Sequence, residues 1–124
     1  MNQKALLDKG IKIWGSPFTP EFMDWAFMGM PEELGAIWAE IPKNLDILIT
    51  HGPPFGILDR TMRGENAGCP KLLEAIQIKT PRIHVFGHIH EGYGLREKNG
   101  TVFMNASLCN ANYELVNKPV VIEL

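Results

Sequence analysis

The sequence lacks a long hydrophobic run. No stretch approaches the roughly 20 apolar residues of a membrane-spanning helix, and the N-terminal segment Met1–Asp8 has too short an apolar core for a signal peptide. An excess of basic charge is also absent, because 12 Lys and Arg stand against 14 Asp and Glu. We therefore expect a cytoplasmic protein whose main partner is neither a nucleic acid nor a membrane.

Cysteine is scarce as well. The chain has two, Cys69 and Cys109, which lie far apart and form no CxxC pair, so we expect reduced thiols rather than a disulfide framework. Internal repeats, low-complexity tracts and linker-like stretches are missing too. A length of 124 residues with 45% apolar and 21% charged residues is typical of one soluble globular domain.

Nine prolines and twelve glycines divide the chain into short elements, which favours a mixed α/β fold. Apolar patterning predicts strands at 11–14, 46–50 and 82–86 and helices at 31–41 and 70–80, with a right-handed crossover between two parallel strands. The Asn99-Gly100 pair predicts a hairpin between 94–97 and 101–104, because it accepts the positive φ of a type I′ turn. Residues 119–124 are predicted as a last edge strand.

Three of the four histidines follow the two predicted central strands. His51 comes directly after 46–50, and His88 and His90 come just after 82–86. Open α/β sheets bind ligands at the carboxyl ends of their strands, and an imidazole with a pKa of about 6.5 can give a lone pair to zinc, manganese or iron. The cluster therefore predicts a metal site, whereas His84, inside a strand, is predicted to be structural.

The segments that carry these histidines match a known family. THGPP at 50–54 and FGHIHEGYG at 86–94 resemble the calcineurin-like metallophosphoesterase superfamily, most closely its small metallophosphoesterase-domain-containing branch, and 13–17, 46–49, 104–107 and 119–121 resemble the same branch. The resemblance implies an α/β fold, the C-terminal part of a four-layer αββα sandwich with a mixed sheet. It also implies hydrolysis of phosphomonoesters or phosphodiesters by water activated between two divalent metals. By the same resemblance His51 and His88 would bind one metal, of Mn, Zn or Fe, and His90 the other.

Three elements of the family pattern do not occur in the 124 residues: an early D-x-H, a G-D whose aspartate bridges the metals, and a G-N-H. We therefore assign no catalytic residue and predict that 1–124 is the C-terminal portion of a single calcineurin-like phosphoesterase domain. On its own it would have negligible turnover. The alternative is a non-catalytic metal-binding or protein-interaction module derived from that fold.

The substrate expected from the family is a small phosphoester, with a nucleotide among the candidates. Arg60, Arg63 and Lys71 could contact the phosphate of such a substrate, and Tyr93 could face a base. Glu91 and Asn105 could orient the metal-binding histidines. A dense apolar stretch would form a lid, an interface or core, and where exposed would promote self-association; its members are Met23, Trp25, Phe27, Met28 and Met30.

Overall fold

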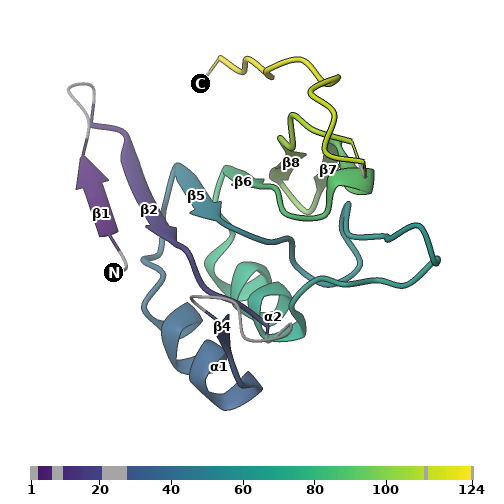
Figure 1. Ribbon diagram of the computed structural model, residues 1–124. Coiled ribbons are helices and arrows are strands. Elements are labelled where there is room, and N and C mark those ends of the chain that lie inside the picture. Colours follow the sequence, from purple (N-terminus) through teal and green to yellow (C-terminus); the bar gives the residue numbers. More distant parts are fainter. Residues whose placement is uncertain (1–2, 7–9, 21–27, 111, 124) are drawn as a thin grey trace.

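A six-stranded mixed sheet forms the centre of the computed structural model, which describes residues 3–6, 10–20, 28–110 and 112–123 (Figure 1). Across the sheet the strands are β1 (Gln3–Leu6), β2 (Lys12–Ser16), β5 (Ile47–Thr50), β6 (Ile83–Phe86), β8 (Thr101–Asn105) and β7 (Gly94–Lys98). A separate parallel pair is formed by β3 (Thr19–Pro20) and β4 (Met28–Gly29).

The four central strands of the sheet are parallel. β2 pairs with β5, β5 with β6 and β6 with β8 in parallel, whereas β1 and β7 close the two edges in antiparallel pairing. The carboxyl ends of β5 and β6 therefore meet at one edge of the sheet. This arrangement confirms the α/β prediction and the strand, helix and strand order from 46 to 86.

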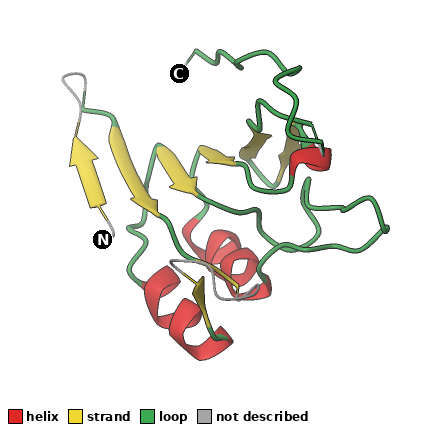
Figure 2. Cartoon of the chain, viewed as in Figure 1, coloured by secondary structure: helices red, strands yellow, loops and turns green. Residues whose placement is uncertain are grey.

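Two helices lie where proline was expected to open them. α1 (Pro31–Ala39) and α2 (Pro70–Lys79) each carry proline at the first position, where the missing backbone N–H is no loss. Downstream, Pro42 and Pro81 prevent either helix from continuing. Figures 1 and 2 show both helices together beside the sheet.

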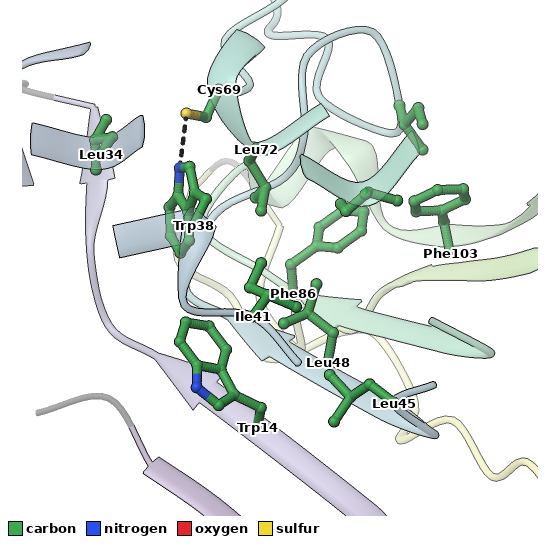
Figure 3. Packing of buried hydrophobic residues seen from close by; sticks show 12 residues of the cluster. Trp14, Leu34, Trp38, Ile41, Leu45, Leu48, Cys69, Leu72, Phe86 and Phe103 are labelled. Atoms are coloured by element: carbon green, nitrogen blue, oxygen red, sulfur yellow. Dashed lines mark hydrogen bonds between the residues drawn. The ribbon is translucent and has the colours of Figure 1, made fainter. Parts of the chain in front are cut away.

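The core fills the space between these helices and one face of the sheet. The strand register places Trp14, Leu48, His84 and Phe103 in one row on that face, and Leu34, Trp38, Leu72 and Ile76 pack on it from the helices (Figure 3). The Trp38 indole N–H donates to the Cys69 sulfur at 3.4 Å. A fully buried Leu, Ile or Phe side chain contributes about 1.5–3 kcal/mol to stability. The packed side chains of this core therefore hold the strands in register.

The opposite face of the four central strands is apolar throughout. The register assigns it the residues that alternate with the core row: Ile13, Gly15, Ile47, Ile49, Ile83, Val85, Val102 and Met104. Ile49 is 44% exposed there, and both α-helices of the described residues pack on the other side. The described residues thus supply one sheet and one helical layer of the four-layer arrangement implied by the family resemblance.

Two features differ from the expectations. Residues 119–123 form no strand, because their backbone joins no ladder with either edge strand; Leu124 lies outside the described residues. Strand β1 was not predicted, since its sequence QKAL shows no apolar alternation. Of the apolar stretch, 21–27 lies outside the described residues, and Met30 is 48% exposed.

Both cysteines are free thiols, as expected. Among the helices that the structure describes, none has the length and apolar character needed to cross a membrane.

Candidate metal centre

His51 and His88 come together at the carboxyl ends of β5 and β6. Their strands are neighbours in parallel register, and the Gly87 N–H donates to the His51 carbonyl at 2.9 Å, which closes the gap beyond the strands. His51 Nε2 and His88 Nδ1 share a hydrogen bond at 3.1 Å, in which one of the two nitrogens is the donor, and their ring centroids are 4.6 Å apart. The predicted convergence of these two imidazoles is therefore present.

The backbone at His88 is left-handed. Its φ of 67° is a conformation that residues with a Cβ adopt at a cost of about 1–2 kcal/mol. Such strain persists only where the surrounding structure fixes it, and it concentrates at functional sites. Here the flanking Gly87 is anchored to the His51 carbonyl, so the strained turn is held beside its partner histidine.

His90 begins a short 3₁₀ turn, η1 (His90–Gly92), two residues beyond His88. Its Nδ1 lies 3.0 Å from the Asn110 carbonyl, which can only accept a hydrogen bond, so in the neutral ring Nδ1 carries the proton and Nε2 the lone pair. The Tyr113 ring packs edge-on against the imidazole at 5.3 Å. A carbonyl partner of this kind is a common means of fixing the tautomer of a metal-binding histidine.

The three imidazoles influence one another electrostatically. Burial lowers the pKa of His51, and a positive charge on His90 lowers it further. For His88, burial again lowers the pKa first, followed by the charges of His51 and His90. Both rings therefore favour the neutral form at pH 7, which is the form that binds a metal.

His84 supports the site from beneath. It is fully buried, and its Nε2 lies 2.8 Å from the Thr50 hydroxyl, which in turn donates to the Gly52 carbonyl at 2.7 Å. Because the hydroxyl has one hydrogen, His84 Nε2 must be the donor toward Thr50. These two hydrogen bonds fix Thr50 and Gly52, the residues on either side of His51, in agreement with the structural role predicted for His84.

Asn105 fixes the turn that holds His88 and His90. This fully buried side chain donates to the carbonyls of Ile89 and Leu58 at 2.8 and 3.1 Å, and its oxygen accepts from the backbone and hydroxyl of Ser107. Gly92 contacts the same Leu58 carbonyl so closely that a Cβ would not fit. Asn105 therefore positions the backbone of the turn rather than an imidazole ring.

The other residues singled out by sequence have varied positions. Glu91 accepts a hydrogen bond from the Met62 N–H at 2.9 Å and the Tyr93 hydroxyl donates to the Lys118 carbonyl at 2.8 Å, while Lys71 pairs with Glu74 at 3.6 Å. Sequence reasoning missed Asp59, which is 2% exposed and organises the loop after His51. The sequence signal that could have identified Asp59 is that it is a single aspartate in a loop rich in glycine.

No group of three or more His, Cys, Asp or Glu side chains in the described ranges is arranged to hold a metal ion. These ranges offer a close pair, His51 and His88, with His90 near enough to shift their pKa values. A complete coordination shell would need further ligands.

Known proteins resemble this chain in sequence and in fold. No family model matches the chain. The human protein named metallophosphoesterase domain-containing protein 1 is 47% identical over 119 residues, which is 94% of this chain and 36% of that protein. A UPF0046 protein of Caenorhabditis elegans is 41% identical over 117 residues, or 93% of this chain and 30% of that protein.

A solved crystal structure superposes on 85% of this chain and 44% of its own, with a TM-score of 0.61 and 19% identity, which shows a shared fold. The chain spans about a third of the length of the curated relatives that it matches.

Proposed function

We propose, from the premise that this chain is a homologue of the metallophosphoesterase domain-containing proteins, that it forms part of a metal-dependent phosphoester hydrolase. In this proposal His51, His88 and His90 are the metal ligands that the chain contributes. The homology over 94% of the chain agrees with the family resemblance of the THGPP and GHIH segments. It implies the use of divalent metal.

The observation that carries the proposal is the spacing of the two closest imidazole nitrogens. Two nitrogens bound at 2.0–2.1 Å to one tetrahedral ion stand about 3.3 Å apart. His51 Nε2 and His88 Nδ1 are 3.1 Å apart in a hydrogen bond, so their spacing fits one shared ion once the donor nitrogen of that bond gives up its proton. The lowered pKa values of both rings favour the neutral, metal-binding form.

Each histidine has a distinct task in this proposal. His51 and His88 would hold one ion, and His90, whose Nδ1 bonds to the Asn110 carbonyl, would offer Nε2 to a second ion. A divalent metal supplies Lewis acidity and an activated water in such sites. The chain's own contribution is to orient the ligands through Thr50, His84 and Asn105.

Turnover by the chain alone is expected to be negligible. A bridging carboxylate is what keeps two ions at a short distance, and the D-x-H, G-D and G-N-H elements are not in the sequence. We expect hydrolysis of bis-p-nitrophenyl phosphate with manganese only after the upstream residues of a relative are joined to the chain or added as a fragment. Robust turnover by the chain itself would show that the ligand count is wrong.

The second candidate function is a metal-binding or protein-interaction module without catalysis. It is favoured by the absence of a group of three ligands among the described residues. It predicts that the upstream residues restore no hydrolysis, even though metal still binds. The same hydrolysis assay therefore separates the two functions.

Metal binding itself is tested by calorimetric titration with manganese or zinc. We expect binding by the wild-type chain and a large loss of affinity in His88→Ala, because that change removes one of two close ligands. Arg82→Met, which alters an exposed arginine that pairs with Asp46 and precedes β6, whereas His88 follows the other end of that strand, is the matched control. Equal metal affinity of the wild type and His88→Ala, or no metal binding by the wild type, would refute the site.

A further inference from the structure

A hollow whose lining contains no histidine lies at the η1 turn that begins with His90. Its volume is about 440 Å³, and it opens between the loop that follows His51 and the start of β7. We name it the arginine hollow, after the two guanidinium groups in its wall; its lining residues with polar side chains are Asp59, Arg60, Asn66, Glu91, Tyr93 and Arg96.

The loop that forms one wall is held in place from inside. The Asp59 carboxylate accepts hydrogen bonds from the N–H groups of Gly56 and Gly68 at 2.9 and 2.8 Å. The Met62 N–H donates to Glu91 at 2.9 Å and ties the loop to the η1 turn. Because these bonds fix both walls, the hollow is formed before any ligand arrives, which lowers the entropic cost of binding.

Two arginines from different segments line this hollow without a carboxylate partner. Arg60 comes from the loop and Arg96 from β7, and the ion pairs found in the described ranges, Lys71 with Glu74 and Arg82 with Asp46, include neither of them. The Asp59 carboxylate is 2% exposed and occupied by backbone N–H groups. Guanidinium groups bind phosphate oxygens in pairs of parallel hydrogen bonds, so two of them favour a phosphate ligand.

The remaining polar groups of the lining suit hydroxyl groups rather than an anion. Asn66 offers an amide donor and acceptor, and the Glu91 carboxylate keeps acceptor capacity beyond its bond to Met62. A carboxylate repels a phosphate but accepts hydrogen bonds from hydroxyl groups. The hollow therefore combines side chains that bind an anion with side chains that bind hydroxyl groups.

We propose that the arginine hollow binds a phosphate ester that carries hydroxyl groups, in the class of sugar phosphates. The phosphate contacts Arg60 and Arg96, and the hydroxyls contact Asn66 and Glu91. This site goes beyond the proposed function, because none of the three predicted metal ligands lines it and binding requires no metal.

The test is a calorimetric titration of the whole chain with ribose 5-phosphate in the presence of EDTA. We expect binding by the wild-type chain and a loss of affinity of about tenfold or more in Arg60→Met and in Arg96→Met, since each removes a charge-assisted contact. Arg63→Met is the matched control, because Arg63 lies in the same loop outside the lining of the hollow. His88→Ala should leave the affinity unchanged, which separates this site from the metal centre.

All of these arginines are exposed, so the variants are expected to unfold at the wild-type temperature, and thermal unfolding checks this. The proposal is overturned if the wild-type chain does not bind ribose 5-phosphate, if both arginine variants bind as the wild type does, or if Arg63→Met weakens binding equally. Inorganic phosphate that binds as tightly as ribose 5-phosphate would overturn the assignment of the hydroxyl region.

Discussion

His88 combines a predicted metal-ligand position with a strained backbone. Asparagine tolerates the left-handed conformation better than most residues, whereas a β-branched residue tolerates it poorly. At a φ of 67°, His88→Asn should keep the free energy of unfolding within about 0.5 kcal/mol of the wild type, and His88→Val should lower it by about 1–2 kcal/mol. Denaturant unfolding measures both.

Metal affinity should fall in both His88 variants, because neither side chain replaces the imidazole ligand. The pair therefore separates the backbone role of this position from its ligand role. Equal stability of the Asn and Val variants would show that the turn relaxes and that strain at His88 is not retained.

His84 makes the stability of the fold sensitive to acid. Burial lowers the pKa of His84 to about 3, so the folded protein keeps this ring neutral while the unfolded chain protonates it near its ordinary value of 6.5. The unfolded state therefore binds more protons below pH 6.5, and stability falls with decreasing pH by about 1.4 kcal/mol per pH unit until the folded pKa is reached.

The measurement is denaturant unfolding at pH 7 and pH 5 for the wild type and His84→Gln. Between pH 7 and pH 5 the free energy of unfolding should fall by about 2 kcal/mol less in the variant than in the wild type. The difference arises over the 1.5 pH units below the unfolded pKa of His84, where the unfolded wild-type chain binds a proton that the variant cannot bind. His51 and His88, whose pKa values are also lowered, are present in both proteins and cancel in the comparison. Asp46 has a lowered pKa too, but its contribution is lost only at more acid pH. Equal losses would mean that His84 is protonated in the folded state.

Asn105 joins three segments of the chain: the end of β8, the turn after β6 and the loop after β5. Asn105→Ala removes the partner of the Leu58 carbonyl and of the Ser107 N–H and hydroxyl, whereas the Ile89 carbonyl still accepts from the Gly92 N–H; each buried unsatisfied group costs about 1–3 kcal/mol. We expect a loss of several kcal/mol in unfolding free energy, measured by denaturant.

The same change should weaken metal binding by about 10–100-fold in the fraction that remains folded, because Ile89 lies between His88 and His90. Gln77→Ala, an exposed amide on α2, is the control and should alter neither property. Unchanged metal affinity in folded Asn105→Ala would show that the turn keeps its shape without this side chain.

Local sequence signals predicted the elements that bear the site. Proline marked the first residue of α1 and of α2, and the apolar runs at 46–50 and 82–86 became β5 and β6. The Asn99-Gly100 pair formed the predicted turn, with φ values of 52° and 83°. These signals are short-range, and each depends on a residue type with one strong conformational preference.

The sequence pattern did not predict the contacts between segments that are distant in the chain. Strand β1 depends on pairing with β2 rather than on its own pattern, and residues 119–123 resemble a strand but find no partner. At the site, the sequence placed His51 and His88 near each other. It did not show that Asp59 and Asn105 organise the surrounding loops through bonds to distant backbone groups.

The sheet face opposite the two helices, which we call the open face, governs whether the molecule associates. Over the four central strands it carries no charged side chain, and Ile49 is 44% exposed on it whereas Ile83 and Met104 are buried. The register extends it to Leu95 of β7, which is 55% exposed, and to Glu97 of the same edge strand. An apolar area of this kind in water favours association. A second copy of the chain is the partner we propose, because the four central strands of two such faces can stack without burying a charge while Glu97 on the edge strand β7 stays in water, and stacked sheets pack about 10 Å apart.

Sedimentation velocity over a range of concentrations tests this proposal. The wild-type chain should show a sedimentation coefficient that rises with concentration, and Ile49→Lys should shift the association to higher concentration because stacking would bury the new charge. Ile78→Lys changes an equally apolar side chain that is 71% exposed on α2, on the opposite side of the sheet, and should leave association unchanged. If both variants associate alike, the contact lies elsewhere on the surface, and if the wild type is monomeric throughout, the open face is stable in water.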